Sequence, residues 1–211
     1  MLWVLNQLGG GERGDPPGPR RAVCGPSKGF EAPAGRLFAP NLLETLPMKT
    51  QSPQFWKLFK AKASSLKLKS SEPDALFEEL ADLLVASDQI EDSQRAAAVS
   101  ALAERERVAS TGVGQNIAIP HVPLPGLARV AVGISIHPEG IHWRAIDGEP
   151  VHIFVTVMRP EGSTPDHDPE QHIEMMRWIA RLARHDDFRR FAMAAGTRTE
   201  LVQLMKEMAD V

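Results

Sequence analysis

Apolar residues recur at helical spacing in two segments of the first half of the chain. The first segment spans residues 71–87, opens with a serine and carries Pro73 in its first turn. A capping side chain followed by an early proline is typical of a helix start. The second segment begins at Asp92 or Ser93 and ends around Arg107. The pattern predicts two helices, each with one apolar face.

Shorter apolar runs predict strands in the middle of the chain. Leu66 and Leu68 alternate with lysines, as in a half-buried edge strand with its charges outward. Residues 117–119 form a buried apolar run. Pro120 follows directly, and proline cannot continue a central strand ladder. We therefore expect the chain to leave the sheet where His121 stands.

Two further strands are expected after this point. Residues 130–137 alternate between apolar and smaller or polar side chains, which indicates a strand with two different faces. A turn at 138–140 is expected to lead into a short returning strand at 141–143, and a second turn follows at 147–148. Residues 151–158 are apolar on both faces, as in a central, buried strand.

The last third of the chain predicts three helices after a polar, mobile loop at 159–168. Asp168 and the proline after it form a helix start, with apolar residues then at helical spacing to about residue 183. A second helix is closed by Gly196, and Thr197 opens the last one. Two helices, several strands and three more helices predict an α/β fold, a mixed β-sheet sandwiched by helices.

The domain organisation follows from composition. Residues 1–52 are rich in Gly, Pro and Arg and show no sustained period, so we expect a disordered extension before a single domain at 53–211. The extension is either a tether for a partner or a segment without function. In the second case translation would start at Met48.

Bulk properties exclude several classes of function. The chain of 211 residues has a formal net charge of −3, which argues against a dedicated nucleic-acid surface. It has one cysteine, so an intrachain disulfide is impossible. No apolar run approaches the about 20 residues of a membrane helix, and we expect a cytoplasmic protein with no membrane insertion.

The residues between Arg105 and His121 concentrate the candidate chemistry. Arg105 stands at the end of a predicted helix, and the loop after it combines hydroxyls with glycines. Glycines let successive backbone N–H groups converge on an anion. The predicted phosphate-binding residues are Ser110, Thr111, Gly112 and Gly114. An imidazole is mostly neutral at pH 7 and can act as a nucleophile without a general base, so His121 is the candidate phosphoryl acceptor.

Other chemistries are less well supported by these residues. The pairs His137–His142 and His167–His172 have spacings compatible with zinc ligands, but neither lies on a two-histidine metal motif. A histidine-based metallohydrolase is the remote alternative. The Gly-x-Gly at Gly112 lacks the further residues of a nucleotide-binding loop. We expect no metal and no cofactor.

The run Arg-Glu-Arg-x-x-Ser-Thr-Gly-Val-Gly-x-x-Ile-Ala-Ile-Pro-His, at 105–121, resembles a known active-site signature. It is that of the fructose/mannitol-type enzyme IIA domains of the bacterial phosphoenolpyruvate:sugar phosphotransferase system, including the nitrogen-related members. The resemblance implies that His121 is phosphorylated and that Arg105 and His172 are active-site residues. The loop before His172 is longer than the family's and contains His167, which competes for the same assignment.

The resemblance also implies partners. A phosphocarrier of the HPr type would donate the phosphoryl group. With no IIB or membrane IIC segment fused to the chain, we expect a free-standing, nitrogen-type regulator acting on target proteins. The alternative is a IIA component that passes phosphate to the IIB subunit of a fructose/mannitol-type sugar permease.

Overall fold

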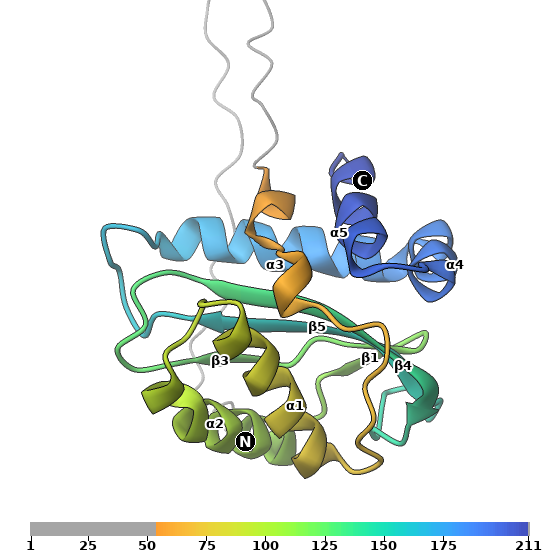
Figure 1. The fold of residues 1–211 in the computed structure, drawn as a ribbon, viewed down its shortest axis with the longest axis horizontal. Coiled ribbons are helices and arrows are strands. Elements are labelled where there is room, and N and C mark those ends of the chain that lie inside the picture. The colour runs from red at the N-terminus through yellow and green to blue at the C-terminus, as the bar shows by residue number, and fades with distance from the viewer. Residues whose placement is uncertain (1–53, 211) are drawn as a thin grey trace, which may run out of the picture. The chain divides into compact units, whose positions relative to one another are not determined.

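The computed structural model describes residues 54–210. The predicted extension at 1–52 lies outside the described residues and stays a prediction. The described part confirms the α/β class, with one mixed sheet between two layers of helices (Figure 1).

The sheet is organised around β5 (Val151–Arg159), the strand predicted to be central. β2 (Ile117–Ala118) and β3 (His121–Pro123) both run parallel to β5. β4 (Ala131–Ile141) pairs antiparallel with β5, and β1 (Gly112–Gly114) pairs antiparallel with β2. Every described strand therefore pairs either with β5 or with a strand that pairs with β5.

The expectation that the chain leaves the sheet at Pro120 was wrong. The chain resumes pairing at once, because His121 is in register with Val157 of β5. Pro120 lacks only the amide hydrogen, and its carbonyl oxygen still accepts a hydrogen bond from the Val157 amide at 2.9 Å. β2 and β3 are therefore two halves of one interrupted strand, and His121 begins the second half.

The turn and returning strand expected at 138–143 were also wrong. β4 continues through that segment to Ile141, with an irregular register between Ile136 and Ile141 that absorbs the proline and glycine. The predicted edge segment exists only as a short pairing. The Leu68 amide donates to the Ile136 carbonyl at 2.9 Å, and Ser65 bridges Ser135 in parallel.

Helices cover both faces of the sheet (Figure 1). α1 (Pro73–Ala86) and α2 (Arg95–Val108) pack on one face, around a core that includes Val122 and Phe154 of the strands. α3 (Pro169–Arg184), α4 (Asp186–Ala194) and α5 (Arg198–Glu207) pack on the other, around Ile119 and Val157. Three short 3₁₀ helices complete the described chain: η1 (Phe55–Leu58), η2 (Ala61–Ala63) and η3 (Asp92–Gln94).

The helix caps agree with most of the expected starts. The side chains of Asp168 and Thr197 accept hydrogen bonds from the amides of Glu170 and Glu200, as capping residues do. The capping position of α1 is Glu72, one residue after the expected serine.

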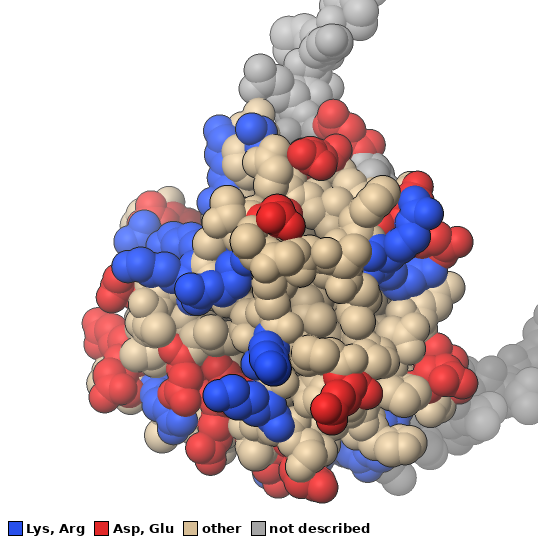
Figure 2. Space-filling model, turned by 45° about the vertical axis from the view of Figure 1, so that its right-hand side comes forward, with Lys and Arg blue, Asp and Glu red and all other residues tan. Residues whose placement is uncertain are grey.

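Among residues 54–210 no helix is both long and apolar enough to span a bilayer. The face drawn in Figure 2 interleaves acidic and basic side chains around an area without either, so it carries no single sign of charge.

Candidate active site

Strand alternation decides which way His121 points. Ile119 belongs to the core under α3, whereas Val122 belongs to the core under α1 and α2. Because side chains alternate along a strand, His121 shares the face of Ile119 and lies under the helix that carries His172. It is half-buried there.

The Ile119 carbonyl defines the chemistry of the His121 ring. Its oxygen lies 2.8 Å from Nδ1 of His121 and can only accept a hydrogen bond, so Nδ1 carries the proton. Nε2 is then left with a free lone pair. Burial lowers the pKa of His121, the Ile119 hydrogen bond opposes this, and the positive charges of Arg105 and Arg159 lower the pKa further. The ring is therefore a neutral nucleophile at pH 7.

Arg159 is the residue of this site that the sequence did not single out. It ends β5, and its register partner Pro123 lies two residues beyond His121, so Arg159 and His121 share one face of the sheet. Its Nη1 donates to the Pro160 carbonyl at 2.8 Å. Its charge lowers the pKa of His121, His167 and His172. The sequence does show a basic residue directly after a buried strand, which could have pointed to this site. Arg159 was instead placed in the loop expected at 159–168.

Arg105 lies where it was expected, in the last turn of α2. Its Nη1 donates to the Ala109 carbonyl at 2.7 Å, which holds the guanidinium at the end of the helix. From there its charge reaches His121 strongly enough to lower that residue's pKa. Two arginines from different elements thus act on one imidazole.

The hydroxyls of Ser110 and Thr111 are engaged within the protein. Ser110 Oγ donates to the Trp143 carbonyl at 2.9 Å and accepts from the Gly112 amide at 3.1 Å. Thr111 donates through both its amide and its hydroxyl to Oε2 of buried Glu106, at 2.9 and 2.6 Å. The indole of Trp143 donates to the Thr111 hydroxyl at 3.1 Å. These hydrogen bonds hold the segment in place. They also use the hydroxyl groups of Ser110 and Thr111, which we expected to bind phosphate.

The two glycines serve the β1–β2 hairpin. A Cβ on Gly112 would meet Ala145 at 2.8 Å, so only glycine fits there. Gly114 has φ +86° and lies against the carboxylate of Asp147. It pairs with Ile117, which is four residues and roughly 13 Å of strand away from His121. Arg105 and His172 therefore lie within electrostatic range of His121, whereas Gly114 stands at the turn of the β1–β2 hairpin.

His172 and His167 approach each other at the start of α3. Their ring centroids are 5.9 Å apart and the planes meet at 67°. Burial, followed by the charges of Arg159, His167 and His121, lowers the pKa of His172 to about 4. Burial and Arg159 lower the pKa of His167, which Asp168 opposes. Of these two residues, only His172 has a pKa that the charge of His121 also lowers.

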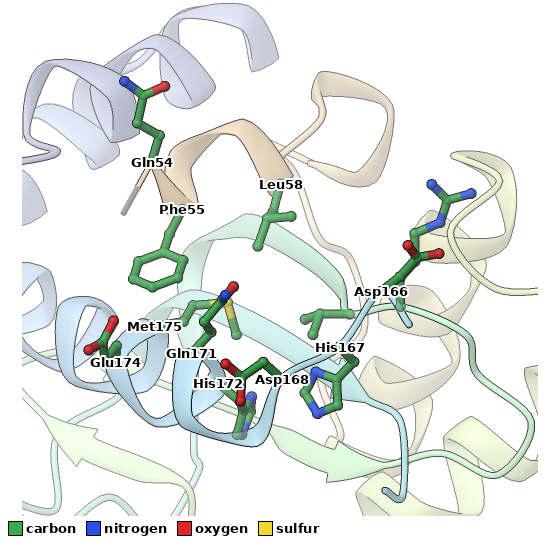
Figure 3. Close-up of a pocket in the computed structure, with 12 residues that line it drawn as sticks. Gln54, Phe55, Leu58, Asp166, His167, Asp168, Gln171, His172, Glu174 and Met175 are labelled. Atoms are coloured by element: carbon green, nitrogen blue, oxygen red, sulfur yellow. The ribbon is translucent and has the colours of Figure 1, made fainter. Parts of the chain in front are cut away.

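A pocket of about 620 Å³ opens beside the two rings. Figure 3 shows His167 and His172 near Asp168 at one wall, with Phe55 and Leu58 of η1 on the opposite side. Among the described residues, no group of three or more His, Cys, Asp or Glu side chains is arranged to hold a metal ion.

Comparison with known proteins identifies the family of the chain. The model of the "Phosphoenolpyruvate-dependent sugar phosphotransferase system, EIIA 2" family matches residues 57–208. The chain belongs to this family. EIIA proteins of this type are phosphohistidine carriers, so the chain has a transferase role in general terms.

Both branches of the family are among its relatives. The PTS fructose-specific EIIA component of Haloferax volcanii is 28% identical over 137 residues, which are 65% of this chain and 84% of that protein. The nitrogen regulatory protein of Pseudomonas aeruginosa is 32% identical over 110 residues, 52% of this chain and 68% of that protein. The crystal structure of IIA-Ntr from Neisseria meningitidis shares the fold, with a TM-score of 0.61 and 23% identity over 72% of this chain and 98% of that chain.

Proposed function

We propose that Nε2 of His121 accepts a phosphoryl group from a phosphohistidine of an HPr-type carrier and later gives it up. The observation that carries this proposal is the hydrogen bond between His121 Nδ1 and the Ile119 carbonyl, which leaves Nε2 as the free nucleophile. Its lone pair forms the new P–N bond as the donor's P–N bond breaks. The electrons of the broken bond return to the donor's imidazole.

The neighbouring residues suit the charge that arrives with the phosphoryl group. Phosphorylation at Nε2 makes the remaining Nδ1–H a stronger donor, and the Ile119 carbonyl at 2.8 Å is already positioned to accept it. Arg105 and Arg159 act on the same ring from two elements. In this proposal both guanidiniums and the His172 ring stabilise the phosphoryl oxygens, because charge-assisted hydrogen bonds are about twice as strong as neutral ones.

Labelling with phospho-HPr tests the assignment. We expect wild-type protein to carry one acid-labile, base-stable phosphoryl group, and peptide mapping to place it on His121. The His121→Ala variant should take up no label, whereas His142→Ala, which removes an exposed histidine of another segment, should label normally. Normal labelling of His121→Ala would refute the proposal.

For the role of the carrier we favour the nitrogen-type regulator, in which the phosphorylation state of His121 changes binding to target proteins. The identity of 32% to a nitrogen regulatory protein supports it. The second candidate, a IIA component that serves a IIB subunit, is supported by the match over 84% of a fructose-specific EIIA component. Rapid transfer of label from the phosphorylated chain to a purified fructose-type IIB would favour the second candidate. No transfer would favour the first.

A further inference from the structure

The described site contains a third histidine for which the proposed phosphoryl transfer has no role. His167 is only 6% exposed, and its Nε2 is buried without a hydrogen-bond partner. Nδ1 of His172 is also buried without a partner. Buried polar atoms are nearly always hydrogen-bonded, so two unpartnered ring nitrogens on rings in contact call for an explanation.

The backbone holds His167 firmly beside His172. The amide of His167 donates to the Thr164 carbonyl at 3.1 Å, and the Thr164 amide donates back to the His167 carbonyl at 3.2 Å. The Thr164 hydroxyl in turn donates to the Ala128 carbonyl at 2.6 Å, which ties the turn to the segment before β4. On the other side, Asp168 caps α3. His167 is therefore fixed from both directions.

A rotation and a short approach of the two rings separate them from a hydrogen bond. Their centroids are 5.9 Å apart in an edge-to-face arrangement. The second side-chain torsion of histidine is broad, but with the centroids 5.9 Å apart a turn alone leaves the nitrogens about 3.6 Å apart at best, so a hydrogen bond of about 2.7–3.2 Å also needs the rings to approach by roughly 0.4–0.9 Å. The bond would satisfy both buried atoms at once.

We propose that His167 is a positioning residue whose Nε2–H donates to Nδ1 of His172 and thereby fixes the tautomer of His172. A neutral imidazole has one donor and one acceptor nitrogen. When Nδ1 of His172 accepts, its Nε2 must carry the proton and is a donor toward the phosphoryl group. The reverse direction would leave a lone pair on Nε2 of His172, which an anionic group repels.

The electrostatics of the site keep both rings in the neutral form that this pair needs. Burial and the charge of Arg159 lower the pKa of both residues, that of His172 to about 4. Asp168 opposes the shift at His167, and His121 adds to it at His172. Asp166 and Glu174 also line the adjoining pocket. The inference rests on the proposed function for its purpose, but the hydrogen bond itself can be measured without any phosphoryl transfer.

The test compares two variants of His167. His167→Gln can place an amide N–H near the position of Nε2, whereas His167→Phe keeps a ring and removes the donor. Nitrogen-15 NMR of the imidazoles in the unphosphorylated full-length protein reports the His172 tautomer directly. We expect the Nε2–H form in wild type and His167→Gln, and a mixture of tautomers in His167→Phe. A His172 tautomer that is the same in wild type and His167→Phe overturns the inference.

Phosphoryl-transfer rates supply the second readout. His167→Phe should be slower by about threefold to tenfold, the value of one neutral hydrogen bond, with rescue in His167→Gln. Equal slowing in both variants, with equally lowered melting temperatures, would indicate a merely structural role and contradict the inference. An unlabelled wild-type protein with the expected tautomers would instead refute the proposed function and leave the histidine pair standing.

Discussion

The carbonyl oxygen of Ile119 lies 2.8 Å from Nδ1 of His121, two residues further along the same chain. The interruption between β2 and β3 makes this contact possible, because Ile119 and Pro120 stand between the two halves of the strand. The contact decides which nitrogen of the imidazole is free. The tautomer of the His121 ring therefore depends on a local backbone feature, and the surroundings of the ring lower the pH below which Nε2 is protonated.

The pH dependence of phosphoryl acceptance should reflect the lowered pKa of His121. Burial and two nearby arginines disfavour the protonated ring, so the nucleophile stays available at pH values where an ordinary histidine, with a pKa of about 6.5, is half protonated. We expect the midpoint of the pH profile for labelling by a phosphocarrier to lie below about pH 6.5. A profile with its midpoint at or above this pH would contradict the assigned environment.

Stability should fall between neutral and mildly acidic pH. The folded-state pKa of His172 is about 4, below the unfolded value of about 6.5, so the unfolded chain binds more protons in this window. The contribution of His172 to the free energy of unfolding is therefore fully present above about pH 6.5 and is lost as the pH falls toward 4. Melting temperatures across this range should show the loss, and His172→Gln should reduce it. The lowered pKa of the Asp147 carboxyl acts in a lower range, below its ordinary value of 3.8.

The two arginines should matter for transfer more than for folding. Arg105→Ala and Arg159→Ala each remove a positioned positive charge, and we expect transfer to slow by at least about tenfold in each, the low end for such a donor. Arg107→Ala, an exposed arginine of the same helix end, is the matched control and should transfer at the wild-type rate. A normal rate in Arg159→Ala would show that its charge acts on the histidines without contacting the phosphoryl group.

Thr111→Val separates a structural from a phosphate-binding role. The substitution removes the hydroxyl that bonds to buried Glu106 and to Trp143, so it should destabilise the fold by about 1–3 kcal/mol. Chemical denaturation measures this cost. Phosphoryl acceptance at a temperature where the variant is folded should change little. A large loss of rate at unchanged stability would instead restore the direct phosphate contact that the sequence predicts.

Local patterns in the sequence determined most of the elements correctly. The caps at Asp168 and Thr197 and the doubly apolar strand at 151–158 each carry their signal within a few residues, so no knowledge of distant contacts was needed. The family signature between Arg105 and His121 is local in the same sense. Most element types and their order were therefore readable from the chain alone, and the nucleophile that the sequence suggests, His121, stays a prediction.

Tertiary structure alone decided how the site is assembled. Arg159 joins His121 because β3 and β5 pair in a particular register, and no local pattern contains that register. His167 meets His172 because hydrogen bonds to Thr164 close the turn before α3. Thr111 turns inward because Glu106 is buried beside it. Each of these contacts depends on hydrogen bonds that form when the helices pack on the sheet. Sequence patterns show only which positions are buried at regular intervals.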